Sequence, residues 1–364
     1  MGQTTSIEWC HATFNPWEGC AKISAGCRNC YAEGQHRHRL SALGSPGGPG
    51  TCWGIGAPRM ARSESYWKQP LRWDKEAAGL GIRRRVFCAS MADVFEQQSE
   101  LSRGFAGQTA PVPTGPDRTP RQVRFVDLDA ERVRLLELIR STPHLDWLLL
   151  TKRPAAILQA LRAVRQRLHA GQDLAGRPAD AAALTEWVER WLAGNPPHNV
   201  WLGSSVEDQA SADERVPALL EVPARVRFLS CEPLLEAVTL TDYLPLAGCS
   251  CGEGPDDCRC RLNYSVAADA AVDWVIVGGE SGPRARLMHP DWARQLAAEC
   301  RSTGTAFLFK QWGEWSTAPV GHPHEHPAGQ VNKTAAGEPA PMWRVGKKLA
   351  GRQLDGRTHD GVPG

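Results

Sequence analysis

Three cysteines lie within eleven residues near the start of the chain, with the spacing Cys20-x6-Cys27-x2-Cys30. Thiolates are ligands for zinc and for iron–sulfur clusters, so one loop that carries three of them can hold a metal. A structural zinc site takes a fourth Cys or His, whereas a [4Fe–4S] cluster on three thiolates leaves one iron open. The presence of three cysteines rather than four favours a [4Fe–4S] cluster. Zinc with a ligand from outside the loop, or three unrelated thiols, are the alternatives.

A second group of four cysteines lies within twelve residues: Cys249, Cys251, Cys258 and Cys260. Four thiols in a Gly-rich turn suit a closed tetrahedral Zn²⁺ site. Such a site would staple an insertion that has too little apolar content to fold alone. A second iron–sulfur cluster is the alternative.

The chain has 364 residues, of which 42% are hydrophobic and 23% charged, so wholesale disorder is excluded. We find no apolar run of the roughly 18 residues that a membrane span needs and no signal peptide. Twelve cysteines in a chain of this type indicate metal or catalytic roles more than disulfides. We expect a cytoplasmic protein without membrane contact; the sequence leaves its oligomeric state open.

The positive charge is concentrated in residues 1–90, which hold twelve Lys and Arg against six Asp and Glu, although the whole chain carries only +2. This asymmetry is compatible with a polyanionic partner such as a nucleic acid or nucleotide. A solvated basic surface is the alternative.

Buried strands that alternate with helices must position these groups. Apolar runs that predict strands occur at residues 12–14, 86–90, 147–151, 200–203, 226–230, 274–278 and 306–310. Apolar residues at helical spacing predict helices over 132–140, 155–168 and 292–300. The alternation indicates parallel βαβ units, so we expect an α/β fold with a TIM-type (β/α) barrel, full or partial.

We expect residues 1–315 to form one barrel-like catalytic domain. Residues 104–120 are rich in Pro, Thr and Gly and predict a surface insertion, and residues 249–260 form the Cys-rich insertion. Residues 316–364 are expected to be an irregular extension that packs on the barrel.

Each predicted strand ends in polar or charged residues. They are Asp93, Lys152, Arg153, Glu207, Glu232, Glu280 and Lys310. The carboxyl ends of parallel barrel strands share one face, which holds the active site, so we expect these groups to converge there. Helix caps or rim charges are the alternative for each. We assign Lys152, Arg153, Glu207, Glu232 and Lys310 to catalysis, and Asn15, Tyr31, Asp93 and Ser204 to cofactor binding.

Several strings closely resemble the phage-associated Gp-thirty-seven/Gp-sixty-eight family, a domain of unknown function. They are FNPW (14–17), GCRNCYAE (26–33), ESYW (64–67), FCASMADVFE (87–96), LTKRP (150–154), FLSCEPLL (228–235), VIVGGESGP (275–283), KQWGEW (310–315) and VGKKLAGRQLDG (345–356). The resemblance covers nearly the whole chain.

That family in turn resembles radical S-adenosylmethionine (SAM) enzymes, remotely including spore photoproduct lyase. The resemblance implies that Cys20, Cys27 and Cys30 hold a [4Fe–4S] cluster whose open iron binds SAM. It also implies that Gly278, Gly279 and Glu280 form the Gly-Gly-Glu element that binds the SAM amino group. The spacing here differs from the usual C-x3-C-x2-C, and the Gly-Gly-Glu element ends a late strand rather than the second.

Three functions remain open. The leading hypothesis is a radical-SAM-like iron–sulfur enzyme that modifies or repairs a nucleic acid or nucleotide and needs an electron donor. The second is a non-radical hydrolase or lyase that uses strand-end carboxylates and lysine for acid–base chemistry, with structural zinc in the cysteine loop. The third is a nucleic-acid-binding protein without chemistry, which predicts salt-sensitive binding.

Overall fold

The computed structural model describes residue 5 and residues 7–34, 52–97, 109–113, 120–172, 180–245, 270–317, 329–331 and 340–364. The chain forms two compact units. Unit 1 comprises residues 1–202 and 222–225, and unit 2 comprises residues 203–221 and 226–364. No helix among the described residues is long and apolar enough to cross a membrane.

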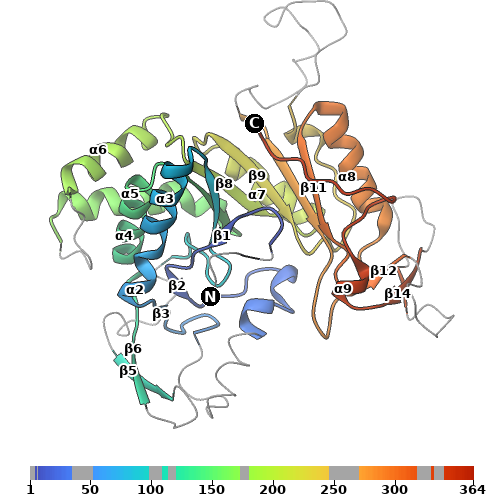
Figure 1. Ribbon diagram of the computed structural model, residues 1–364, viewed down its shortest axis with the longest axis horizontal. Coiled ribbons are helices and arrows are strands. Elements are labelled where there is room, and N and C mark those ends of the chain that lie inside the picture. Colours follow the sequence, from blue (N-terminus) through green and yellow to red (C-terminus); the bar gives the residue numbers. More distant parts are fainter. Residues whose placement is uncertain are drawn as a thin grey trace, which may run out of the picture. The chain divides into compact units, whose positions relative to one another are not determined.

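Unit 1 is built on parallel strands in the order β1-β4-β7-β8 (Figure 1). Their bounds are Ala12–Thr13, Arg84–Cys88, Leu145–Thr151 and Val200–Ser205, and β8 is divided between the units. Its helices are α2 Glu64–Trp67, α3 Gln69–Leu80, α4 Leu128–Arg140, α5 Ile157–His169 and α6 Ala181–Leu192. Short strands β2 Trp17–Glu18 and β3 Met60–Ala61 pair antiparallel beside them.

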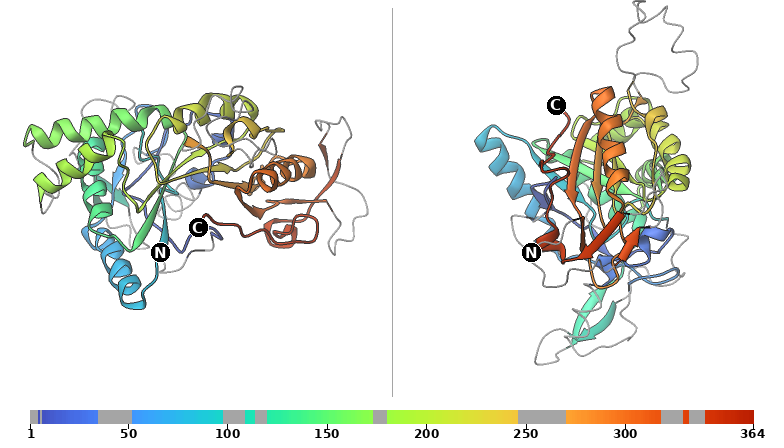
Figure 2. Two further views of the ribbon diagram at one scale, coloured as in Figure 1. Left: turned by 90° about the horizontal axis from the view of Figure 1, so that it is seen from above. Right: turned by 90° about the vertical axis from the view of Figure 1, so that its right-hand side faces the viewer.

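Unit 2 continues the parallel order as β8-β9-β10-β11. β9 spans Val226–Cys231, β10 Trp274–Gly278 and β11 Ala306–Gln311, with helices α7 Gln209–Leu220, α8 Pro290–Thr303 and α9 Lys347–Ala350. A small antiparallel sheet has the order β12-β14-β13, with bounds Trp315–Ser316, Ala340–Arg344 and Gly329–Val331. Figure 2 gives two further views, in which α8 lies alongside β10 and β11.

The sequence explains why these elements form. Every residue of β9 and of β10 is buried, as expected for strands covered on both faces. The sequence of β10 is a continuous apolar run, whereas β9 also contains Arg227 and Ser230. Helix α5 buries Ile157, Leu161, Val164 and Leu168 at intervals that return to one face every turn. Helix α8 begins at Pro290 and is followed by Gly304, whose φ of 71° is a left-handed conformation that favours glycine.

The predicted α/β class and the parallel strands are confirmed, with strand ends displaced by at most two residues. In each unit the strands follow one another across the sheet in chain order. The predicted surface insertion 104–120 overlaps an antiparallel hairpin, β5 Thr109–Pro113 with β6 Pro120–Arg124. The predicted irregular tail instead contains β13, β14 and α9. The boundary expected at 315/316 does not coincide with the division into units, and residues 249–260 lie outside the described residues.

Candidate functional site

The cysteine loop of unit 1 follows β1 and β2, next to the carboxyl ends of β4 and β7. The 3-10 turn Ala25–Cys27 is closed by the Cys27 amide, which donates to the Ser24 carbonyl at 3.0 Å. An ion pair of 2.6 Å between Lys22 and Glu33 ties the two sides of the loop together. The loop therefore has a defined fold of its own.

Arg153, at the end of β7, joins this loop to the strands. Its guanidinium lies 3.0 Å from Asp93 Oδ2 and 3.8 Å from Cys20 Sγ, and it donates to the Ala21 carbonyl at 3.2 Å. Asp93, after β4, also accepts from the Thr151 hydroxyl at 2.7 Å and from the Lys152 amide at 3.1 Å. Both charged side chains are at least nine-tenths buried. The predicted meeting of Asp93, Lys152 and Arg153 at the ends of β4 and β7 is thus present within unit 1.

Glu96 fixes the loop from its buried side. Its Oε1 accepts from the Ala21 amide at 2.8 Å and from Arg59 Nη2 at 2.7 Å, while Oε2 accepts from Arg59 Nε at 2.7 Å. Both side chains are completely buried. Arg59 also donates to the carbonyls of Cys52, Gly54 and Ala57, which satisfies its remaining donors. A charged pair in this position is costly to break, because either partner alone would be an uncompensated buried charge.

Burial favours the neutral form of two thiols in this loop, Cys20 and Cys30. Burial raises the pKa of Cys20 well above its ordinary range; the carboxylates of Glu96 and Asp93 act in the same direction and Arg153 opposes them. Burial also raises the pKa of Cys30, against the backbone amides of Glu33 and Ala32, which donate to its sulfur. A metal would have to displace protons from these thiols, so its binding would be stronger at higher pH.

The three thiols have the donor chemistry of zinc or iron–sulfur ligands. Among the residues that the structure describes, however, no group of three or more His, Cys, Asp or Glu side chains is arranged to hold a metal ion. Cys27 lies close enough to Cys30 to influence its pKa, whereas Cys20 contacts Arg153. The loop therefore fits a thiolate-bound metal by residue type, and ligation would require Cys20 to join the other two.

Asn15 and Tyr31 connect the same loops. The Asn15 side chain accepts from the Met91 amide at 2.7 Å and donates to the Ser90 hydroxyl at 3.2 Å, and it is buried. The Tyr31 hydroxyl donates to the Ser90 carbonyl at 3.1 Å, although nearly half of this residue is exposed. Both residues thus have structural contacts, and their predicted role in cofactor binding stays a prediction.

In unit 2, Lys310 and Glu232 form an ion pair at the ends of β11 and β9. Lys310 Nζ lies 2.9 Å from Glu232 Oε1, and the Ser230 hydroxyl donates to Oε2 at 3.2 Å. Both charged side chains keep partial exposure, 18% and 12%. A lysine and a carboxylate in contact can exchange a proton, so this pair can act as acid and base toward a ligand that reaches it.

The two glycines of the Gly-Gly-Glu element are required by close packing. A Cβ at Gly278 would lie 2.6 Å from Glu232 Oε1, and one at Gly279 would lie 2.0 Å from the Trp312 carbonyl oxygen. Gly278 therefore lets the Glu232 carboxylate lie against β10. This packing accounts for both glycines without a ligand, and their predicted role in SAM binding stays a prediction.

The other two predicted strand-end carboxylates of unit 2, Glu207 and Glu280, are neutralised by arginines. Glu207 lies 2.7 Å from Arg215, and both side chains are buried. Glu280 accepts from Arg286 Nη2 at 2.6 Å and from its Nε at 2.8 Å, and this hydrogen bonding raises the pKa of Arg286. Ser204 is fully buried, and its hydroxyl has no hydrogen-bond partner among the described residues. Glu207 and Glu280 thus serve the packing of unit 2, unlike the Lys310–Glu232 pair.

The comparison with known families gives a match over most of the chain. The family described as "Protein of unknown function (DUF5131)" matches residues 4–106 and 126–363. The chain belongs to this family. No curated protein and no solved structure matches the chain. Both clusters described above lie within the segments that match DUF5131, whereas the match omits residues 107–125, which include the β5–β6 hairpin.

Three residues of the unit 1 cluster were missed by the sequence analysis: Arg59, Glu96 and Thr151. Glu96 and Thr151 belong to strings that carry the family resemblance, FCASMADVFE and LTKRP, so a signal for them was present. Arg59 lies in a Gly-rich loop, and the sequence around it has no periodic pattern that would indicate a buried position. Its role depends on a partner 37 residues away in the sequence.

Proposed function

We propose that the chain is an iron–sulfur enzyme of the radical SAM type that acts on a nucleic acid or nucleotide. One observation carries the proposal: the three-cysteine loop lies where β1, β4 and β7 end and is joined there to Arg153 and Asp93. In parallel α/β folds this edge of the sheet is where ligands bind. We further propose that the parallel strands, which follow chain order without reversal, belong to a partial (β/α) barrel.

Cys20, Cys27 and Cys30 would hold a [4Fe–4S] cluster, which leaves one iron open for SAM. A reduced cluster of this kind supplies one electron for the cleavage of SAM to a 5′-deoxyadenosyl radical. An electron donor is therefore required, and a cytoplasmic location would keep the thiols reduced.

Arg153 has a specific part in this proposal. Burial and two carboxylates raise the pKa of Cys20, and the Arg153 guanidinium opposes part of that rise, which favours the thiolate that ligation needs. Glu96 holds the neighbouring Ala21 amide and, through Arg59, anchors the loop from its buried side. These residues hold the loop in place and bias the proton on Cys20.

The first test is metal analysis on protein purified without oxygen. We expect about four irons and four sulfides per chain and a broad absorption near 400 nm. Both should be lost in Cys27→Ala and kept in the matched variant Cys300→Ala, whose buried thiol lies in α8. The loaded protein should then cleave SAM to 5′-deoxyadenosine under a strong reductant. Zinc without this absorption, or iron that persists in Cys27→Ala, would rule out the cluster.

A second candidate, a non-radical hydrolase or lyase, rests on the Lys310–Glu232 pair. This pair combines opposite charges and partial exposure, whereas Glu207 and Glu280 are tied to arginines. Turnover would then be abolished by Lys310→Met and retained in Cys20→Ala. The same two variants distinguish the candidates, because the iron–sulfur proposal requires loss of activity in Cys20→Ala.

A further inference from the structure

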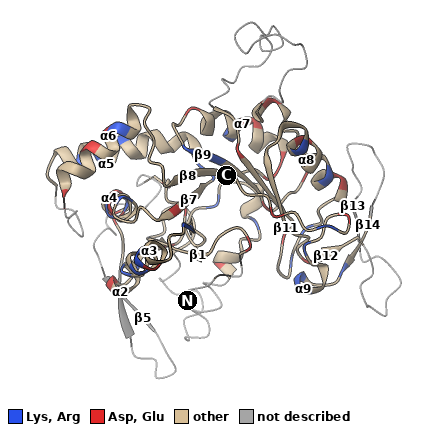
Figure 3. Cartoon of the chain, turned by 45° about the horizontal axis from the view of Figure 1, so that its top comes forward, with Lys and Arg blue, Asp and Glu red and all other residues tan. Residues whose placement is uncertain are grey.

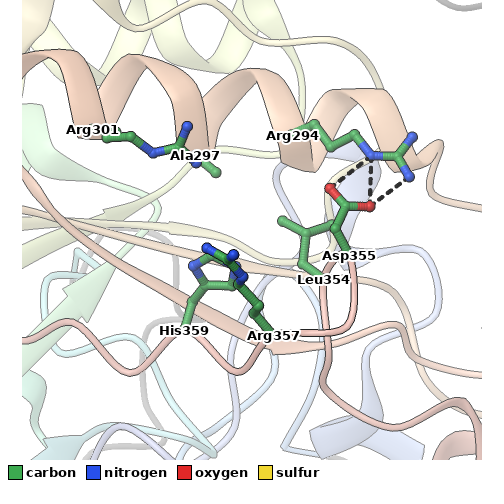
Figure 4. A pocket seen from close by; sticks show the side chains of 7 residues that line it. All are labelled: Arg294, Ala297, Arg301, Leu354, Asp355, Arg357 and His359. Carbon is green, nitrogen blue, oxygen red and sulfur yellow. Dashed lines mark hydrogen bonds and ion pairs between the residues drawn. The ribbon is translucent and has the colours of Figure 1, made fainter.

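A cavity of about 280 Å³ lies within unit 2, between α8 and the segment near the carboxyl end of the chain. Helix α8 contributes Arg294, Ala297 and Arg301, and the facing segment contributes Leu354, Asp355, Arg357 and His359 (Figure 4). The basic residues of α8 are visible in Figure 3. Neither cluster described above shares a residue with this cavity.

The helix side of the cavity follows from residue spacing. Arg294, Ala297 and Arg301 are separated by three and four positions, so they lie along one face of α8. Ala297 is buried, and its small side chain leaves room between the two arginines. The helix thus presents two guanidinium groups on either side of a gap.

A tight turn builds the opposite side. The Leu354 amide donates to the Arg357 carbonyl at 2.9 Å, and the Arg357 amide donates back at 3.1 Å. Asp355 and Gly356 between them have φ of 52° and 73°, as in a two-residue turn in which both central residues are left-handed. Asp tolerates this conformation better than most residues. The turn therefore fixes the backbone from which Arg357 projects.

His359 is fixed by pairing to β11. The Phe309 amide donates to the His359 carbonyl at 3.1 Å, and the Gly361 amide donates to the Phe307 carbonyl at 2.9 Å. The imidazole meets the Phe307 ring edge-on, with 5.4 Å between centroids. The cavity is accordingly lined by a helix on one side and by a hydrogen-bonded turn and a segment bridged to β11 on the other, which favours a preformed site.

The charge in the cavity is unbalanced. Its single carboxylate, Asp355, accepts from Arg294 at 2.7 and 3.0 Å, and this hydrogen bonding lowers the pKa of Asp355. The guanidinium groups of Arg301 and Arg357 have no hydrogen-bond or ion-pair partner among the described residues. Two uncompensated cations therefore face an open cavity.

We propose that this cavity binds a phosphate group carried by a nucleotide or by a nucleic-acid strand. Guanidinium groups match phosphate oxygens with paired hydrogen bonds, which makes arginine the preferred residue for phosphate recognition. The volume is close to the roughly 300 Å³ at the small end of ligand pockets, so one phosphate with its sugar fits. The site does not depend on the function proposed for the cysteine loop.

The test compares wild-type protein with the double variant R301Q/R357Q. Inorganic phosphate is titrated by calorimetry, and a short fluorescein-labelled single-stranded DNA is followed by anisotropy at several salt concentrations. We expect the double variant to weaken binding of the preferred probe by about tenfold or more. If the phosphate belongs to a nucleic-acid strand, the slope of log affinity against log salt concentration should also become shallower by about one for each phosphate contact removed. Binding of phosphate without strand binding assigns the site to a phosphate carried by a small molecule such as a nucleotide, and not to a nucleic-acid strand.

Two controls protect this test from a folding artefact. Arg190 is an exposed arginine on α6 in unit 1, and R190Q makes the same charge change away from the cavity. D355N removes the competing carboxylate and should strengthen phosphate binding, which misfolding cannot do. Absence of binding by both probes, equal affinities in R301Q/R357Q and R190Q, or weaker binding in D355N would each overturn the proposal.

Discussion

The same kind of charge pair is used in opposite ways in the two units. In unit 1, Arg59 donates twice to Glu96, and neither side chain has any exposed surface. In unit 2, Arg294 donates through two nitrogens to Asp355, with side-chain exposures of 45% and 55%. Both pairs join a guanidinium to a carboxylate, and they differ most in burial.

The difference in burial determines which of the two ion pairs can separate without a large loss of stability. Separating a buried pair leaves a charge in a medium of low polarity, whereas water solvates both partners of an exposed pair. The unit 1 pair is therefore a fixed support for the cysteine loop. The unit 2 pair can rearrange when an anion arrives.

The strongest test removes the carboxylate of the buried pair. Glu96→Ala should lower the free energy of unfolding by about 3–5 kcal/mol, because Arg59 is left buried and uncompensated. Urea unfolding followed by circular dichroism measures the change. The matched control is Glu64→Ala, since Glu64 pairs with Arg134 at the surface with 72% exposure. That variant should lose less than about 1 kcal/mol. Equal losses would contradict the comparison.

A steric change tests the Lys310–Glu232 pair next. Gly278→Ala would place a methyl group 2.6 Å from Glu232 Oε1, which forces the carboxylate to move. We expect a loss of about 1–3 kcal/mol in chemical unfolding. Gly79→Ala is the control, because no heavy atom lies within 4 Å of the added carbon in α3. It should be neutral or stabilising by up to about 1 kcal/mol. A neutral Gly278→Ala would show that the close contact is absent in solution.

Buried thiols extend the comparison to pH. Burial raises the pKa of Cys88, and it raises the pKa of Cys52 and of Cys300 to about 12. In the unfolded chain these thiols lose their protons near pH 8.5, so the folded state then binds more protons. Stability should be unaffected by them below that pH and should fall as pH rises above it.

The variant Cys88→Ala isolates one of these thiols. Between about pH 9 and 10 its unfolding free energy should decline less steeply than that of the wild type, by about 1.4 kcal/mol per pH unit. Unfolding curves in the presence of a reductant, recorded at intervals of half a pH unit, give both slopes. Identical slopes would mean that Cys88 titrates normally in the folded protein.

The smallest effect is expected at the exposed pair. Asp355→Asn should change the unfolding free energy by no more than about 0.5–1 kcal/mol, because the pair is solvated and Asn also tolerates a positive φ. Thermal unfolding at low and at high salt would measure it. A loss comparable to that of Glu96→Ala would erase the distinction between the two regions.

The central strands could be predicted because burial on both faces leaves long apolar runs in the sequence. Helix α6 carried an equally good signal, with Asp180 as its N-cap and Leu184, Val188 and Trp191 at helical spacing, but it was overlooked. Helix α7 was harder to find, because Pro217 lies inside it and its apolar face is weak. The short strands β12 to β14 lack the length that produces a clear alternation.

The candidate site was predictable in part for a similar reason. Asp93 and Arg153 follow the ends of β4 and β7, so topology alone brings them to one edge of the sheet. The partners that neutralise each charge depend on tertiary contacts, and no local pattern links Glu207 with Arg215 or Arg59 with Glu96. From the sequence alone, the strand-end carboxylates are equivalent. In the structure Glu232 pairs with a lysine, whereas Glu207 and Glu280 pair with arginines.

The pairing of the chain's last residues with β11 has a consequence for how the protein avoids other chains. β11 is the last strand in the sheet order, and an exposed last strand offers unpaired amides and carbonyls to any extended peptide. Here Leu308 pairs with Asp360, and the neighbouring backbone hydrogen bonds reach Gly361. The segment at residues 359–361 thus covers the edge strand of its own sheet. Without that segment, β11 would expose unpaired backbone groups on which another chain could aggregate.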